Sequence, residues 1–280
     1  MDGYWWEFDE STQNGKRRRK ALSDSIGRWG YTTGACAAAA AKAAICCLLG
    51  KIDPAGTIEI SLPNGERHLL PVAFSRLTSL GAEAGVIKDA GDDPDITNQS
   101  LVQVAVDWCE GEDVCFAAGE GVGTVTKKGL SIPPGEPAIN PGPRKMIRAA
   151  VRDVTDRAVR VTISIHGGSE LAQKTYNPRL GIENGLSILG TTGRVRPFSC
   201  HALKCSLICL LDVAKGAGVT HPVLVPGNIG ERSARSHLKL SCEQVIEVGN
   251  EWGFLLERLE DYHFTQILIW GHPGKIAKLI

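Results

Sequence analysis

The sequence predicts a mixed α/β fold whose C-terminal part contains a mainly parallel sheet. Short apolar segments at 186–189, 223–226 and 267–270 each run directly into a glycine-containing loop. Helix-forming stretches alternate with these segments, beginning with 200–215, as parallel strands with connecting helices require. Because the loops that follow parallel strands meet at the carboxyl edge of a sheet, we expect one shared ligand-binding edge there.

The first of these loops is the centre of the predicted site. It reads Gly190-Thr191-Thr192-Gly193 and precedes the helix-forming stretch 200–215. Glycine lets backbone N–H groups approach a ligand closely, and a helix N-terminus favours negative charge. The two sister loops supply the other candidate ligand-binding residues, which are Gly227, Asn228, Gly230, Glu231, Gly271, His272 and Gly274. The amide of Asn228 and the carboxyl of Glu231 suit the hydroxyl groups of a nucleotide-like ligand.

Composition and charge argue against several classes of protein. The 280 residues contain 31 Lys plus Arg and 31 Asp plus Glu, so a uniformly basic surface for nucleic acid is not indicated. No apolar run reaches the roughly 20 residues that a membrane span requires. The N-terminus lacks the apolar core of a secretory signal, so we expect a cytoplasmic protein. Homo-oligomerisation is left open.

Nine cysteines, an odd number, favour reduced thiols over a disulfide framework. The densest set is Cys200, Cys205 and Cys209 with His201, for which a metal site on one helix is an alternative. Packing of small apolar residues is the favoured interpretation, because free cysteine is usually buried. We therefore predict no metal site.

The N-terminal region divides into a tail and a helix. Residues 1–29 are predicted to be a disordered tail, and the basic run 16–20 is interpreted as solvated, with a targeting or phosphate-binding patch as the alternative. Residues 37–49 are predicted to form a helix, with Thr32 or Thr33 as its N-cap. An anion pocket at this N-terminus and close packing of the alanines against a sheet both stay open.

A hairpin and an acidic loop follow. Alternating apolar residues flank Asn64-Gly65, which predicts a β-hairpin over 57–72. The loop 85–95 ends with four aspartates in seven residues, a density that suits a divalent metal or a general base, although the spacing is not that of an EF-hand. Asp89 and Asp93 are the candidate bases, and a solvated turn is equally supported.

The middle of the chain predicts two strands, 101–106 and 160–165, and a helix over 146–154. The glycine-rich segment 119–128 matches neither the dinucleotide fingerprint nor the P-loop. The proline-rich segment 133–144 is predicted to be a loop, because proline removes backbone donors and restricts the residue before it.

The sequence contains no Ser-His-Asp order, zinc-finger spacing or kinase motif. Methyl transfer from a sulfonium donor needs mainly the alignment of donor methyl, acceptor carbon and leaving sulfur, so it is compatible with that absence. Cations beside glycine or proline loops suit a polycarboxylate ligand, although each alone is more simply a surface charge. These cations are Lys88, Lys127, Lys128, Arg144, Arg179 and Arg194.

Six motifs resemble those of the CbiD family, the cobalt-precorrin-5B C(1)-methyltransferases of the anaerobic cobalamin (vitamin B12) pathway. They are GYTTGACAAAAAKAA at 30–44, KDAGDDPDITN at 88–98, GVGTVTKKGLSIPPGEPAINPGPRKMI at 121–147, NPRLGIENGLSILGTTGRVRP at 177–197, GNIGE at 227–231 and GHPGKIAKL at 271–279. The resemblance implies transfer of a methyl group from S-adenosylmethionine to ring carbon C(1) of cobalt-precorrin-5B, giving cobalt-precorrin-6A. The cobalt would arrive within the tetrapyrrole substrate.

The resemblance also implies roles for the candidate residues. The loops at 190–193, 227–231 and 271–274 would bind the donor, and because a helix dipole opposes the sulfonium, the first loop would meet the donor's carboxylate or ribose. The acid groups of the substrate would bind Thr32, Thr33, Lys88, Lys127, Arg144 and Arg179. Asp89 or Asp93 would take the proton that the methylated carbon loses.

We place an N-terminal α+β domain at 30–175 and a smaller, Rossmann-like α/β domain at 176–280, which is expected to be shorter at its C-terminus than in the family. Two alternatives stay open. One is a non-catalytic tetrapyrrole-binding protein derived from the enzyme. The other is a nicotinamide-dependent reductase, against which the missing dinucleotide fingerprint counts.

Overall fold

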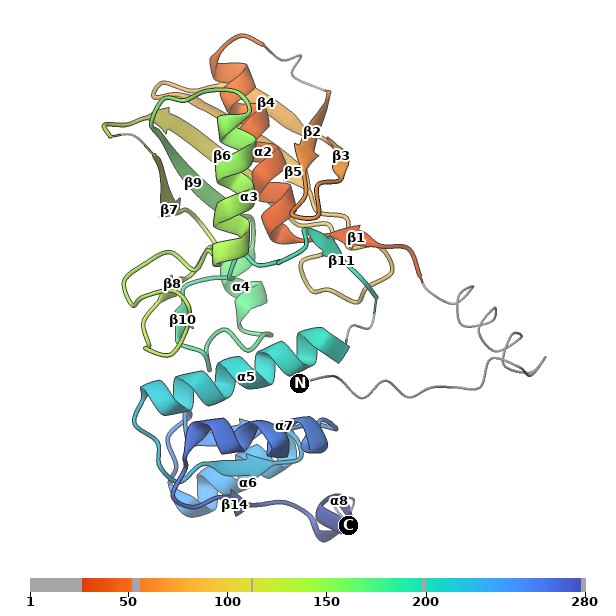
Figure 1. Cartoon of the computed structure of the whole chain (residues 1–280), viewed down its shortest axis with the longest axis vertical. Coiled ribbons are helices and arrows are strands. Elements are labelled where there is room, and N and C mark those ends of the chain that lie inside the picture. The colour runs from red at the N-terminus through yellow and green to blue at the C-terminus, as the bar shows by residue number, and fades with distance from the viewer. Residues whose placement is uncertain (1–26, 52–55, 112, 198–199, 278–280) are drawn as a thin grey trace, which may run out of the picture.

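The structure of the protein is a computed structural model that describes residues 27–51, 56–111, 113–197 and 200–277. The basic run 16–20 and most of the tail predicted at 1–29 lie outside the described residues. Figure 1 shows two stacked parts, here called the N-terminal half (27–197) and the C-terminal half (200–277), with helix α5 (Cys200–Gly216) lying across their boundary. None of the described helices is long and apolar enough to span a membrane.

A five-stranded sheet forms the back of the N-terminal half (Figure 1). Its strands lie in the order β4 (Phe74–Leu77), β5 (Ala82–Ile87), β6 (Leu101–Trp108), β9 (Val159–Ile165) and β7 (Val114–Ala118). The β7–β9 pair is parallel and the other pairs are antiparallel. The strands predicted at 101–106 and 160–165 are confirmed as β6 and β9, and the mixed α/β class is confirmed with them.

Helices α2 (Thr33–Leu48) and α3 (Pro141–Arg152) lie side by side against this sheet (Figure 1). They run in the same direction, because Gly34 lies beside Pro143 near one end and Lys42 pairs with Asp153 near the other. The alanines of α2 are at most 1% exposed, so the helix is packed on all sides rather than along one stripe. The predicted helix over 37–49 is confirmed and begins earlier, at Thr33, with Thr32 as its N-cap.

The predicted hairpin is also confirmed, as β2 (Thr57–Ser61) paired with β3 (Arg67–Pro71). The prediction that the whole of 133–144 is loop is wrong at its end, because α3 already begins at Pro141. Proline is tolerated in the first helical turn, where its missing N–H has no intrahelical partner.

The C-terminal half holds a three-stranded parallel sheet in the order β13 (Val245–Glu247), β12 (Val223–Val225) and β14 (Leu268–Ile269). The described helices of this half are α5, α6 (Asn228–Leu238), α7 (Trp252–Leu259) and α8 (Pro273–Ile276), with the 3-10 turn η1 (Glu260–Tyr262) after α7. The predicted parallel sheet and the predicted helix over 200–215 are confirmed. The Rossmann-like character of this half stays a prediction.

The prediction that 186–189 is a strand of this parallel sheet is wrong. Leu186 and Ile188 form single bridges with Val122 and Ile139, and both side chains belong to the core of the N-terminal half. The flanking short strands also pair within that half: β10 (Ile182–Glu183) with β8 (Thr124–Val125), and β11 (Arg194–Val195) with β1 (Gly30–Tyr31). The short helix α4 (Gly168–Ala172) completes the half.

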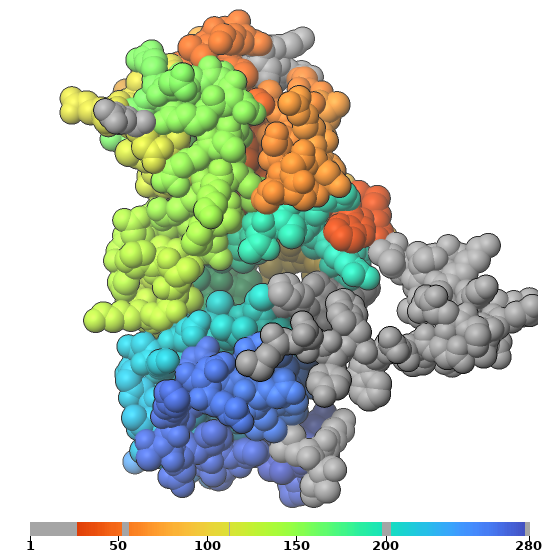
Figure 2. All heavy atoms as spheres, in the orientation of Figure 1, coloured from red at the N-terminus to blue at the C-terminus, as the bar shows by residue number. Residues whose placement is uncertain are grey.

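The described residues form three hydrophobic cores, and the two larger ones are not divided cleanly between the two halves. The first core lies between α2, α3 and the five-stranded sheet. The second core combines residues of α5, α7 and the parallel sheet with Val125, Ile132, Ala138, Leu180 and Ile182 of the N-terminal half. Figure 2 shows the part of the N-terminal half around residue 130 resting directly on α5. In this contact Gly129 lies against the backbone of Asp212 in α5. The domain boundary at residue 176 stays a prediction.

Candidate active site

The carboxyl edge of the parallel sheet carries one of the predicted glycine loops. Strand β12 ends at Val225, and Gly227 connects it to α6 in an extended conformation, with φ 171° and ψ −179°. The N-cap residue of α6 is Gly227, which has no side chain to cap the helix N-terminus. Apart from the two chain neighbours of Gly227, the described residues place one atom within 4 Å of a Cβ on Gly227, Glu247 Oε1 at 3.7 Å. The loop therefore leaves room for a ligand beside its backbone.

The 271–274 loop lies against the 227–231 loop, as predicted for loops that follow adjacent parallel strands. A Cβ atom on Gly271 would lie 2.8 Å from Pro226 Cδ, and one on Gly230 would lie 3.4 Å from the carbonyl oxygen of Trp270. These two glycines therefore allow loop-to-loop packing. His272 caps the short helix α8, where its Nδ1 accepts the N–H of Gly274 at 3.2 Å.

Two carboxylates and one arginine meet at this edge. Arg179 donates to Glu231 Oε2 at 2.5 Å and to Glu247 Oε2 at 3.0 Å, and its guanidinium lies 5.4 Å from the centre of the Tyr176 ring. Glu231, a predicted ligand-binding residue, is only 8% exposed. Sequence reasoning missed Glu247. The signal for it was present, because it ends the strand after α6, about 20 residues beyond the first glycine of the loop.

The 190–193 loop does not lie at this edge. It packs on the N-terminus of α2, where Thr32 N donates to Gly193 O at 3.0 Å and Leu189 N donates to Thr33 Oγ1 at 3.1 Å. Gly190 has a φ of +123°, and a Cβ atom there would lie 2.3 Å from Thr32 Oγ1. The expectation that all three glycine loops share one edge is therefore wrong for this loop. Thr191 and Thr192 are exposed.

Two helix N-termini converge on the 190–193 loop. Gly34, in the first turn of α2, donates its N–H to Leu189 O at 3.1 Å, and a Cβ on Gly142, in the first turn of α3, would lie 3.2 Å from Gly190 O. Both dipoles present their positive ends there, which favours negative charge. Beside this loop, Arg194 Nε is buried and has no hydrogen-bond partner among the described residues. Its guanidinium lies 5.2 Å from the centre of the Trp29 ring.

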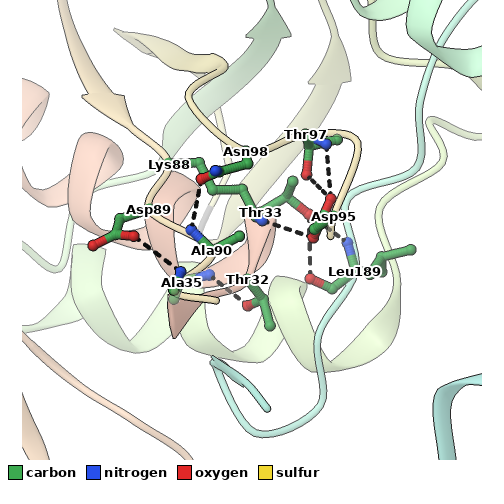
Figure 3. A network of polar contacts seen from close by, with 11 residues as sticks. Thr32, Thr33, Ala35, Lys88, Asp89, Ala90, Asp95, Thr97, Asn98 and Leu189 are labelled. Carbon is green, nitrogen blue, oxygen red and sulfur yellow. Dashed lines mark hydrogen bonds and ion pairs between the residues drawn. The ribbon is translucent and has the colours of Figure 1, made fainter. Parts of the chain in front are cut away.

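Lys88 lies in a polar network beside the N-terminus of α2 (Figure 3). It is 1% exposed, and its Nζ donates to Asp95 Oδ2 at 2.7 Å. Burial works to raise the pKa of Asp95, but the ammonium of Lys88 and hydrogen bonds from Thr97 outweigh it, so the pKa is lowered. The ammonium predicted to bind substrate therefore already has a carboxylate partner in the protein, and its contact with substrate stays a prediction.

The two candidate bases differ in their surroundings. Asp89 accepts hydrogen bonds from Arg28 and, at 2.9 Å, from the N–H of Gly91, and these contacts lower its pKa. Asp93 is half-buried, and its N–H lies 3.4 Å from Ala90 O. A carboxylate with a lowered pKa is a weaker base, so Asp89 is poorly suited to remove a proton.

The other predicted substrate-binding cations also have partners. Lys127 Nζ pairs with Glu243 Oε1 at 2.7 Å and lies 3.4 Å from Cys242 Sγ. Arg144 donates to Ile139 O at 2.8 Å and pairs with Glu136 at 3.2 Å. The sequence gives the position of each cation along the chain but not the carboxylate with which that cation pairs.

The described cysteines differ in their burial. Burial raises the pKa of the Cys36 thiol to about 12, as for a packing residue. Cys205 is exposed and Cys209 is half-buried on α5, while the side chains of Cys200 and His201 lie outside what the structure describes. In the described ranges, no group of three or more His, Cys, Asp or Glu residues could hold a metal ion.

Comparison with known proteins gives these features a context. Residues 20–197, more than half of the chain, match the family model CbiD. The chain belongs to the CbiD family. The resemblance seen in the sequence motifs is thereby confirmed, and the match includes both the acidic loop and the 190–193 loop of this chain.

Two relatives share the same name. A protein of Syntrophotalea carbinolica named cobalt-precorrin-5B C(1)-methyltransferase is 55% identical over 250 residues, which cover 89% of this chain and 71% of that protein. A protein of Methanocaldococcus jannaschii with the same name is 48% identical over 256 residues, which cover 90% and 70%.

A solved CbiD structure extends the likeness to the fold. The 1.9 Å crystal structure of a cobalamin biosynthesis protein (cbiD) from Archaeoglobus fulgidus aligns with a TM-score of 0.50 and 26% identity. The alignment covers 98% of this chain and 87% of that one.

Proposed function

We propose that this chain is a C-methyltransferase of cobalamin biosynthesis that transfers a methyl group from S-adenosylmethionine to C(1) of cobalt-precorrin-5B. The observation that carries the proposal is 55% identity over 250 residues to a protein with the name of that enzyme. The substrate is a cobalt-containing tetrapyrrole, and the metal belongs to the substrate.

The donor fits the carboxyl edge of the parallel sheet. Gly227 leaves open space beside its backbone, the uncapped α6 N-terminus suits the donor's carboxylate, and Glu231 and Glu247 offer acceptors for hydroxyl groups. S-adenosylmethionine supplies a methyl group on a sulfonium. The protein's task is then to align this methyl group with the acceptor carbon and to exclude water.

The substrate's acid groups fit the region around the 190–193 loop. The positive ends of α2 and α3 converge there, and Arg194 presents a guanidinium whose Nε has no partner among the described residues. Thr191 and Thr192 are exposed beside it; the Thr191 hydroxyl can donate a hydrogen bond to a carboxylate, whereas the Thr192 hydroxyl donates to Arg194 O at 3.1 Å. This assignment gives the loop to the substrate rather than to the donor.

Calorimetry with S-adenosylhomocysteine and product analysis test the proposal. We expect the folded protein to bind S-adenosylhomocysteine, and we expect donor with a deuterated methyl group to label the tetrapyrrole in mass spectra. A folded protein that does not bind S-adenosylhomocysteine would contradict the proposal. Tetrapyrrole binding without a labelled product would instead support a non-catalytic carrier.

A further inference from the structure

We infer that Glu247 accepts hydrogen bonds from the ribose hydroxyls of the donor and that Arg179, from the N-terminal half, is the positioning residue that aims it. The inference rests on the proposed function, because it concerns the same donor site. It adds a specificity-determining carboxylate that lies outside the sequence motifs, and it gives Arg179, which lies within the motif at 177–197, a role at the donor site.

The first step is the position of Glu247. It is the last residue of β13 and lies opposite Val225, the last residue of β12, in the parallel register. Among the described residues other than the chain neighbours of Gly227, its Oε1 is the one atom within 4 Å of a Cβ placed on Gly227. In parallel β-α-β units that bind nucleotides, an acidic residue at the end of the second strand receives the ribose hydroxyl, and β12, α6 and β13 form such a unit.

The second step is that the two carboxylate oxygens of Glu247 face different surroundings. Oε2 accepts from Arg179 Nη1 at 3.0 Å, whereas Oε1 faces the open space beside Gly227. A carboxylate held through one oxygen keeps the other in a fixed direction. In Glu247 the free oxygen, Oε1, points toward the space beside Gly227 that we assign to the ligand.

The third step is the charge balance. Glu231 and Glu247 share the guanidinium of Arg179, and without it two nearby carboxylates would repel each other. Arg179 is itself held in place, since its ring neighbour is Tyr176 and its carbonyl oxygen accepts from Lys127 Nζ at 3.4 Å. The next residue, Leu180, is buried in the second core. The N-terminal half therefore fixes the geometry of the donor site in the C-terminal half.

The test compares S-adenosylhomocysteine with its 2′-deoxy and 3′-deoxy analogues by calorimetry. A hydrogen bond to a charged acceptor predicts that the wild-type protein binds the ribose form roughly 10- to 100-fold more tightly than at least one deoxy analogue. In Glu247→Ala this preference should fall to within about 3-fold, because the acceptor is gone. Glu247→Gln keeps the side-chain volume and should show the same loss in weaker form if the alanine variant does not fold.

Arg179→Met should also reduce the preference, and Arg179→Lys should restore part of it by keeping one charged contact. The double variant Arg179→Met with Glu247→Ala should prefer the ribose form over the deoxy analogues no less than Glu247→Ala alone does, since the two substitutions act on one interaction. Arg235→Met is the matched control. Arg235 pairs with Glu231 at 3.6 Å but is not among the contacts of Glu247. The preference of the Arg235→Met variant for the ribose form over the deoxy analogues should therefore stay at the wild-type value.

The possible results separate the two proposals. Wild-type protein that binds S-adenosylhomocysteine while Glu247→Ala keeps the full preference for ribose would overturn the role of Glu247 and leave the methyltransferase assignment intact. If Arg179→Met weakened the binding of S-adenosylhomocysteine and of both deoxy analogues by the same factor, Arg179 would have only a structural role. Folded wild-type protein that binds none of the ligands would contradict the proposed function itself.

Discussion

Replacing Gly227 by alanine should weaken donor binding without destabilising the fold. The backbone of Gly227 has a φ of 171°, an extended conformation that any residue adopts, and the nearest described atom to an added Cβ, chain neighbours aside, is 3.7 Å away. A compatible Gly→Ala change stabilises a protein by about 0.4–1 kcal/mol, which corresponds to a rise in Tm of roughly 1–4 °C. The new methyl group would occupy the space that the donor needs. Overpacking of this size costs about 1–3 kcal/mol, so the Kd for S-adenosylhomocysteine should rise roughly 5- to 150-fold.

Calorimetry and thermal unfolding of the same samples measure both effects. Gly253→Ala is the control, because Gly253 in α7 also has nothing within 4 Å of an added Cβ but lies outside the donor loops. It should give a similar or larger gain in Tm and an unchanged Kd. If Gly227→Ala bound S-adenosylhomocysteine as tightly as the wild type, the space beside Gly227 would not be the donor site. A large fall in Tm would show that this space is needed for folding.

Two further predictions concern ion pairs. Lys88→Met should lower the free energy of unfolding by about 3–5 kcal/mol in chemical denaturation, since it leaves the Asp95 carboxylate partly buried without its cation, and Lys88→Met combined with Asp95→Asn should recover part of the loss. Recovery by the double variant is the decisive result, and no recovery would mean that Lys88 acts through packing alone. The hydrogen bond from Lys127 lowers the pKa of Glu243 from 4.5 to about 2, so its contribution to stability is full above about pH 4.5 and is lost as the pH falls toward 2. Glu243→Gln should flatten the pH dependence of unfolding in that window, and an unchanged slope would refute the pairing.

Local signals predicted the elements that depend on local chemistry. The hairpin followed from Asn64-Gly65 between alternating residues, and α2 followed from its run of alanines. Strands β4 and β5 were not predicted, because alanine and glycine dominate β5 and neither has a high β-propensity. Pro141 shows the opposite case, in which a residue that disfavours helix interiors begins a helix.

The candidate site was predicted in part for the same reason. The pairing of the 227–231 and 271–274 loops follows from consecutive parallel strands. The segment 186–193 has the same pattern of apolar residues and glycine, but a pattern does not say which core receives Leu186 and Ile188. Arg179 likewise reads as a loop cation, and only the fold shows that it reaches across to Glu247. Long-range partners of this kind are invisible to periodicity.

The mixed membership of the second core bears on how the chain acquires its structure. Val125 and Leu180 belong to the same cluster as Leu224 and Leu255, so these contacts join residues far apart in sequence. Contacts of high sequence separation form late, because the entropy of closing the intervening loop opposes them. The interior of the parallel sheet is therefore complete only when Val125 and Leu180 of the N-terminal half pack against it.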